Sequence, residues 1–233
     1  MERIRIRIGN QTASSAPALM VPFEYAVENG FDAFEWFPDR NLSGSGWDVG
    51  DVDSETRNRI RSTALRHDVR LSVHAPWQAN PLKPEAQPLL HGSLDFAREI
   101  GASLLNIHLY AEEGPDAYLS AVAQLTGRLP EAGIRLALEN TPLTTPRHFN
   151  EFFARLLELH PSGADCVGMC LDIGHANLCA STCNDYLRYL GELDPRVPII
   201  HLHAHENWGD RDSHLPMFTG PAGKDGAGIR VLL

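Results

Sequence analysis

Six apolar segments of this chain each end on a side chain that binds metals or moves protons. From the second of these residues to the sixth, successive members are 31 to 34 residues apart. Imidazole and carboxylate groups together are a ligand set for Zn²⁺, Mn²⁺, Fe²⁺ or Co²⁺ rather than for Mg²⁺. The series therefore predicts a divalent-metal centre, and its members are Glu35, His74, His108, Glu139, Asp172 and His203.

An interval of 31 to 34 residues fits one strand, one crossover helix and two loops. Parallel strands need such crossovers, and repeated units of this kind form either a barrel or a doubly wound sheet. Only a barrel directs every strand end to one mouth, where the catalytic groups of such folds lie. We therefore expect a (β/α)₈ TIM barrel spanning residues 1–233 as a single domain. Only seven strands are recognised, so the chain is expected to lack the eighth βα unit and to be incomplete at its C-terminus.

The remaining patterns locate the elements that must hold these side chains. Ile and Arg alternate in IRIRIG, residues 3–9, which predicts the first strand. Ser54 is expected to cap the second helix. Apolar residues at helical spacing, with Pro near starts and Gly near ends, predict the helices. Their approximate ranges are 22–30, 54–67, 90–100, 149–157, 186–190 and 226–233.

Composition restricts the partners. The formal net charge is −10, and Lys83 and Lys224 are the only lysines among 233 residues. A nucleic-acid partner is disfavoured, because duplex binding depends on cationic side chains that neutralise phosphates. The start of the chain does not resemble a signal peptide, and no apolar run approaches a membrane span of roughly 20 residues. A cytoplasmic protein with no membrane partner is predicted, and the unpaired edges of an incomplete barrel would favour homo-oligomers.

Further ligand candidates follow the last two strands. His175 lies three residues beyond Asp172, and a D-x-H pair, Asp212 and His214, follows a Gly-containing loop. His201, His203 and His205 share one face by the strand period of two. Either of the first two fits a metal ligand, and one of the three is expected to be a hydrogen-bond partner of a ligand instead. A convergent set of buried carboxylates and imidazoles is costly unless cations neutralise it.

These motifs resemble the xylose-isomerase-like TIM barrels, which include sugar isomerases and epimerases as well as endonuclease-IV-like abasic-site nucleases. The resemblance rests on LSVHAPW, NIHLY, LALENTP, CLDIGHAN, H-x-H-E-N and D-x-H-L-P, and it extends from the first strand to about Pro221. It implies that Glu139, Asp172 and His203 hold a central metal. In the nuclease branch, the implied additional ligands are His74, His108, His175, Asp212 and His214. The chain departs from the family pattern in lacking the strand-eight Glu.

Three functions remain open at this point. The first is isomerisation or epimerisation of a small sugar or polyol through an enediolate, in which Glu139 moves the proton while His175 and Arg211 bind substrate oxygens. A lyase that dehydrates a keto-polyol through the same enolate would use the same residues. The second is a multi-zinc phosphodiesterase acting on abasic DNA, whose ligand inventory is nearly complete. The third is a metal-binding barrel without catalytic activity. The charge favours the first.

Overall fold

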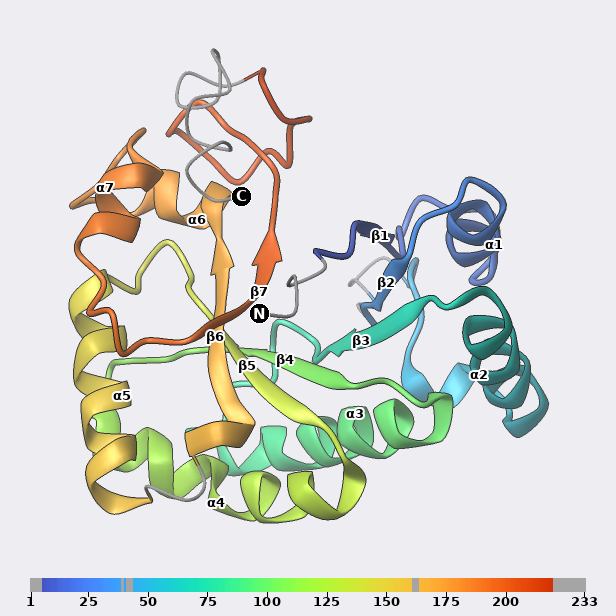
Figure 1. Cartoon of the computed structure of the whole chain (residues 1–233), viewed down its shortest axis with the longest axis horizontal. Coiled ribbons are helices and arrows are strands. Elements are labelled where there is room, and N and C mark those ends of the chain that lie inside the picture. The colour runs from blue at the N-terminus through green and yellow to red at the C-terminus, as the bar shows by residue number, and fades with distance from the viewer. Residues whose placement is uncertain (1–5, 39, 41–43, 161–163, 220–233) are drawn as a thin grey trace, which may run out of the picture. The chain divides into compact units, whose positions relative to one another are not determined.

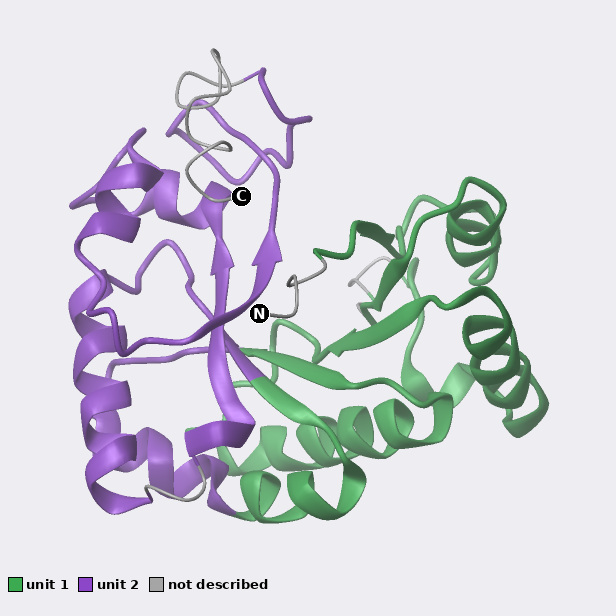
Figure 2. Cartoon of the chain, in the orientation of Figure 1, with its two compact units in different colours: residues 1–107, 124–136 green, residues 108–123, 137–233 purple. Residues whose placement is uncertain are grey.

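A computed structural model describes residues 6–38, 40, 44–160 and 164–219. The chain divides into two compact units, which Figure 2 colours separately. Unit 1 contains residues 1–107 and 124–136, and unit 2 contains residues 108–123 and 137–233. The last predicted helix, 226–233, and the region where an eighth strand would follow lie outside the described residues. Among those residues, no helix is both long and apolar enough to cross a membrane.

Strands and helices alternate along the chain, as Figure 1 shows. In the first half they are β1 (Gly9–Gln11), α1 (Val21–Glu28), β2 (Ala33–Trp36), α2 (Ser54–His67), β3 (Arg70–His74), α3 (Gln87–Ile100) and β4 (Leu104–His108). In the second half they are α4 (Gly114–Ala132), β5 (Arg135–Glu139), α5 (Pro146–Leu159), β6 (Val167–Asp172), α6 (Ile173–Leu178), α7 (Tyr186–Gly191) and β7 (Ile199–His203).

The seven described strands follow one another in the sheet in chain order. In unit 1, β1 to β4 pair in parallel with their neighbours. In unit 2, β6 and β7 pair in parallel, and the register sets Asp172 opposite His203. All six residues of β6 are buried. A continuous buried run of this kind is typical of a parallel strand that is covered on both faces.

The core of each unit accounts for the apolar periodicity of its helices. In unit 1, Trp36 on β2 is fully buried and packs against Phe23 of α1 and Phe96 of α3, with ring centroids 5.4 and 6.3 Å away. In unit 2, Phe152 on α5 packs against Tyr118 of α4 at 5.8 Å. The predicted stripe on α5 is therefore core packing, and five of the six predicted helices are confirmed within a few residues.

Two local expectations need correction. The N-cap of α2 is Asp53 rather than Ser54, because the Asp53 side chain accepts a hydrogen bond from the Thr56 amide. The first strand begins at Gly9, later than residues 3–9 predicted, although residues 1–5 lie outside the described part. A Cβ at position 9 would lie 2.2 Å from the carbonyl oxygen of Ala33, so glycine is needed where β1 meets β2.

Candidate metal centre

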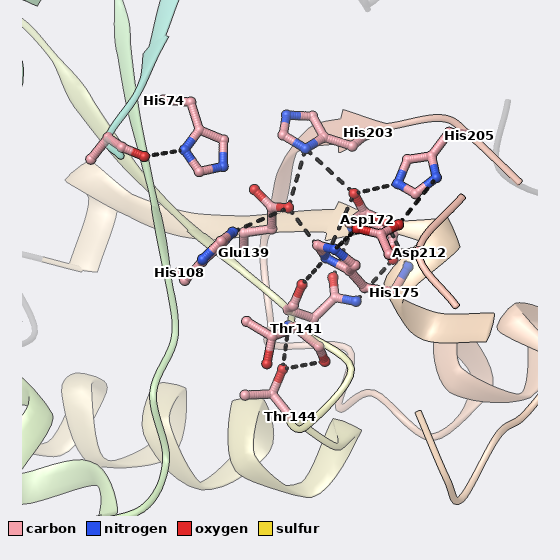
Figure 3. Close-up of polar contacts among 12 residues, drawn as sticks. His74, His108, Glu139, Thr141, Thr144, Asp172, His175, His203, His205 and Asp212 are labelled. Atoms are coloured by element: carbon pink, nitrogen blue, oxygen red, sulfur yellow. Dashed lines mark hydrogen bonds and ion pairs between the residues drawn. The ribbon is translucent and has the colours of Figure 1, made fainter. Parts of the chain in front are cut away.

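The central candidate ligands are the last residues of their strands. Glu139 ends β5, Asp172 ends β6 and His203 ends β7. The carboxyl ends of parallel strands lie at the same edge of a sheet, so unit 2 brings these three side chains together, as Figure 3 shows. Glu139 and Asp172 are 2% and 1% exposed. Sequence spacing predicted this convergence.

The distances within this group fit one divalent ion. His203 Nδ1 lies 3.3 Å from Glu139 Oε1 and 3.6 Å from Asp172 Oδ2. Ligand atoms of a tetrahedral ion with bonds of about 2.1 Å are about 3.4 Å apart. One atom from each of the three residues lies within 4.8 Å of the others, as a shared ion requires. Three protein ligands leave a further coordination position for substrate or water.

Charge supports the same interpretation. Burial alone would raise the pKa of Asp172, but His175, His203 and His205 outweigh it and hold that pKa well below its usual value. Asp172 is therefore anionic at neutral pH beside the buried Glu139, and a buried charge of this kind is retained only with compensating cations. The donor set of two carboxylates and one imidazole suits Zn²⁺, Mn²⁺ or Co²⁺.

The backbone of Asp172 is held by Asn140, a buried residue that the sequence motifs did not identify as part of the site. Asn140 Nδ2 donates to the carbonyl of Asp172, and Asn140 Oδ1 accepts from the amide of Asp172, both at 2.8 Å. The side chain thus extends the pairing between the ends of β5 and β6. It fixes where the Asp172 carboxylate can point.

His175 lies on the first turn of α6, and its two ring nitrogens have different partners. Nδ1 lies 2.8 Å from the carbonyl oxygen of Asn140, which can only accept, so this nitrogen carries a proton. Nε2 faces Asp212 Oδ2 at 3.3 Å. A histidine held by a carbonyl in this way presents Nε2 as a metal ligand. This arrangement favours a ligand role for His175 over a contact to substrate oxygens.

When no ion is bound, the His175 ring carries a proton on Nε2 as well as on Nδ1. Burial lowers its pKa, but the carboxylates of Asp172, Asp212 and Glu139 outweigh burial and raise the pKa to about 11. In the same way, burial would raise the pKa of Asp212, and its contacts with His175 and His214 instead lower it strongly. The proton on His175 Nε2 occupies the side of the ring where an ion would bind.

The D-x-H pair lies beside these residues in unit 2. His214 Nε2 is 3.1 Å from Asp212 Oδ2, and this hydrogen bond is the main cause that raises the pKa of His214. His205, Asp212 and His214 each offer a ligand atom within 4.8 Å of the other two. The structure therefore places His205, one of three histidines between which the sequence does not decide, inside a second group of potential ligands.

The three histidines of the β7 region have separate positions. His203 joins Glu139 and Asp172, whereas His201 lies opposite Cys170 in the pairing of β6 and β7. His205 Nε2 lies 3.0 Å from Asp172 Oδ2, so His205 is the hydrogen-bond partner of a ligand that sequence reasoning expected among the three. The strand period of two shows in the sequence that the three histidines share one face, but it cannot show which of them binds an ion.

The three remaining predicted site residues are His108 in unit 2, His74 in unit 1 and Arg211 in the loop before Asp212. His108 Nε2 is 3.8 Å from Glu139 Oε1. His74, in unit 1, directs Nδ1 to the carbonyl oxygen of Ala75 at 2.5 Å, so Nε2 is the ring nitrogen that could bind an ion. Arg211 is exposed, in the loop next to Asp212.

Comparison with known proteins identifies the fold family. Residues 23–228 match the model of the xylose isomerase-like TIM barrel family. The chain belongs to this family. Protein y4fM of Sinorhizobium fredii is 26% identical over 83% of this chain and 70% of its own length. The predicted family and TIM-barrel fold class are thus confirmed.

Solved structures with this fold have different activities in their names. A D-tagatose 3-epimerase-like protein has a TM-score of 0.68 and 22% identity, covering 97% of this chain and 85% of that one. Endonuclease IV from Thermus thermophilus has a TM-score of 0.67 and 21% identity, covering 94% and 85%. Such likenesses show the TIM-barrel fold alone. The reaction must be argued from the site.

Proposed function

We propose that this protein is a divalent-metal-dependent isomerase or epimerase of a small sugar or polyol. The observation that carries the proposal is the group formed by Glu139, Asp172 and His203, in which two buried carboxylates and one imidazole face a common point at the carboxyl ends of the strands. When bound there, Zn²⁺, Mn²⁺ or Co²⁺ would polarise a substrate carbonyl and make the adjacent C–H acidic.

The chain's own residues divide the remaining tasks. In an isomerisation, Glu139 takes the proton from the carbon next to the carbonyl and returns it to the neighbouring carbon on the same face, while a second proton passes from one enediolate oxygen to the other. In an epimerisation, Glu139 removes the proton and a second proton donor must protonate the opposite face. His203 and His175 approach Glu139 Oε1 at 3.3 and 3.4 Å and fix the orientation of this carboxylate. Arg211, exposed beside Asp212, is the cation available to bind a substrate oxygen or phosphate.

Proton exchange tests the proposal without requiring that the physiological sugar be known. The metal-loaded protein is incubated in D₂O with a panel of aldoses, ketoses and their phosphates, and deuterium incorporation at the carbon next to the carbonyl is followed by NMR. Glu139→Gln should lower the exchange rate by at least about 100-fold. The matched control is Glu131→Gln, an exposed carboxylate on α4, which should leave the rate unchanged. Equal exchange in wild type and Glu139→Gln would reject the assignment of the base.

A second candidate, metal-dependent hydrolysis of a phosphodiester, is favoured by the second ligand group. That group touches the first through the contact of His205 with Asp172, and paired ions often clamp phosphoryl groups in hydrolases. The net charge of −10 opposes DNA as its substrate. Cleavage of duplex DNA containing an abasic site, lost in Asp212→Ala, would establish this candidate, and absence of cleavage at low salt would remove it.

A further inference from the structure

His205 carries a buried nitrogen for which the described residues offer no hydrogen-bond partner. The residue is 9% exposed, and its Nδ1 is buried and unpartnered. Its other nitrogen, Nε2, lies 3.0 Å from Asp172 Oδ2. The anionic carboxylate accepts this bond, so the proton of a neutral His205 ring is on Nε2. The lone pair is then on Nδ1, as in the carboxylate–histidine pairs that orient metal ligands.

The group that faces this lone pair is another anion. Asp212 Oδ1 lies 3.9 Å from His205 Nδ1, too far for a hydrogen bond. A buried lone pair close to a carboxylate is unfavourable unless a proton or a metal cation lies between them. The separation is close to the distance of about 3.4 Å between two ligand atoms of one tetrahedral ion.

Two further imidazoles approach the same carboxylate. His175 Nε2 and His214 Nε2 lie 3.3 and 3.1 Å from Asp212 Oδ2. The ring of His175 is nearly perpendicular to that of His205, with centroids 5.9 Å apart. His205, Asp212 and His214 thus form one group of potential ligands, and His175 approaches the Asp212 carboxylate of this group from α6.

We propose that His205 Nδ1 is the fourth ligand of a second ion held by His175, Asp212 and His214, and that this ion is structural. The resemblance of the sequence implied three ligands there, and a fourth protein ligand changes the role of the site. Zinc sites with four protein ligands are closed and stabilise the fold, whereas catalytic sites keep a position open. The inference goes beyond the proposed isomerase or epimerase function, and a closed structural ion would argue against the phosphodiester candidate, whose second ion must bind substrate.

Ion binding would also change one contact. The rings of His205 and His214 are stacked, with centroids 3.9 Å apart and planes 6° from parallel. A ring nitrogen binds a metal in the plane of its ring, so the stack must open before both rings can reach one ion. His214 has 54% of its side-chain surface exposed and is the ring that turns, since His205 is held by Asp172.

The segment between these two ligands explains what the ion would stabilise. Glu206 and Leu215 exchange backbone hydrogen bonds of 2.8 and 2.7 Å, which close the loop that carries Asp212. His205 and His214 flank this bridge. An ion bound by both, and by His175 on α6, would fasten the loop to the end of β6.

Titration of metal-free protein with Co²⁺ tests the proposal. Four-coordinate cobalt absorbs visible light far more strongly than six-coordinate cobalt, and elemental analysis counts the bound ions. Wild type should bind a four-coordinate ion that is retained in Glu139→Gln, where the central site is impaired. In that background, His205→Ala should weaken this ion by at least about 100-fold. His67→Ala, an exposed histidine on α2, is the matched control and should change nothing.

His205→Gln separates ligation from positioning and serves if the alanine variant does not fold. Its amide can still donate to Asp172 but offers only a carbonyl oxygen, a weaker ligand for Co²⁺ than imidazole nitrogen, so the affinity for this ion should fall as in His205→Ala. An unchanged spectrum and affinity in either folded variant would overturn the proposal, as would a wild-type second ion with a six-coordinate spectrum. If the wild-type protein gives the expected cobalt spectrum but does not catalyse hydrogen exchange with any sugar, the result counts against the proposed function and not against the second ion.

Discussion

One methyl group at position 174 is expected to displace His205 from Asp172. A Cβ on Gly174 would lie 2.0 Å from Cε1 and 2.4 Å from Nδ1 of the His205 ring, far inside van der Waals contact. The carbonyl of Gly174 also accepts a 2.8 Å hydrogen bond from Asn207, which resists movement of the backbone. The ring of His205 must therefore leave its place in Gly174→Ala.

The magnitude follows from what His205 would lose. Its bond to an ionised carboxylate contributes about 1.5 to 3 kcal/mol. Forcing a methyl group into a well-packed site costs about 1 to 3 kcal/mol. We expect the free energy of unfolding of the metal-free protein to fall by about 3 to 5 kcal/mol, and the affinity for the second ion to fall with it.

Urea unfolding followed by circular dichroism, in the presence of a chelator, measures the change. Gly127→Ala is the matched control, because nothing lies within 4 Å of its added Cβ and the residue is exposed on α4. Removing a glycine from a helix should stabilise this variant by about 0.5 to 1 kcal/mol. A Gly174→Ala variant with wild-type stability and two normally bound ions would refute the placement of His205.

Two further outcomes follow from the site. Because the pKa of His175 is raised to about 11 without metal, the ring is charged at neutral pH and must lose a proton to bind an ion. Affinity for the second ion should therefore rise about tenfold per pH unit for each proton displaced. Calorimetry in buffers of different ionisation enthalpy should detect the released protons. An affinity that does not change with pH between about 6 and 8 would contradict this expectation. Asn140→Leu removes both bonds to the Asp172 backbone and should lower the free energy of unfolding by about 2 to 4 kcal/mol in urea, whereas a loss below about 1 kcal/mol would show that Asn140 does not hold the site.

The strand ends could be predicted from the sequence because their signal is long-range and repeated. A residue able to bind a metal recurs at the end of each apolar run at nearly constant spacing. This pattern does not depend on the conformation of the loops between the runs. His203 could be separated from His201 only through the family resemblance, in which the ligand histidine precedes an acidic residue, here Glu206, by three positions. In the structure, His203 lies opposite Asp172 in the pairing of β6 and β7, whereas His201 lies opposite Cys170.

Other features could not be read from the sequence, for physical reasons. The helix α6 has six residues, too few to show an apolar period, and α4 contains Gly127 and Pro130, which argue against a helix locally. Asn140 acts through its amide on a backbone 32 residues away, and nothing in LALENTP indicates that partner. The role of His205 depends on the space left by Gly174, a contact between distant segments.

The metal content of the purified protein tests the central claim most directly. The protein is prepared without chelator, dialysed and analysed for transition metals, beside Asp172→Asn, which removes a charge from the central group. We expect at least one tightly bound Zn²⁺, Mn²⁺ or Co²⁺ per chain and a clear loss in the variant. Less than about a tenth of an equivalent in wild type, with no uptake of added Zn²⁺, Mn²⁺ or Co²⁺, would contradict it.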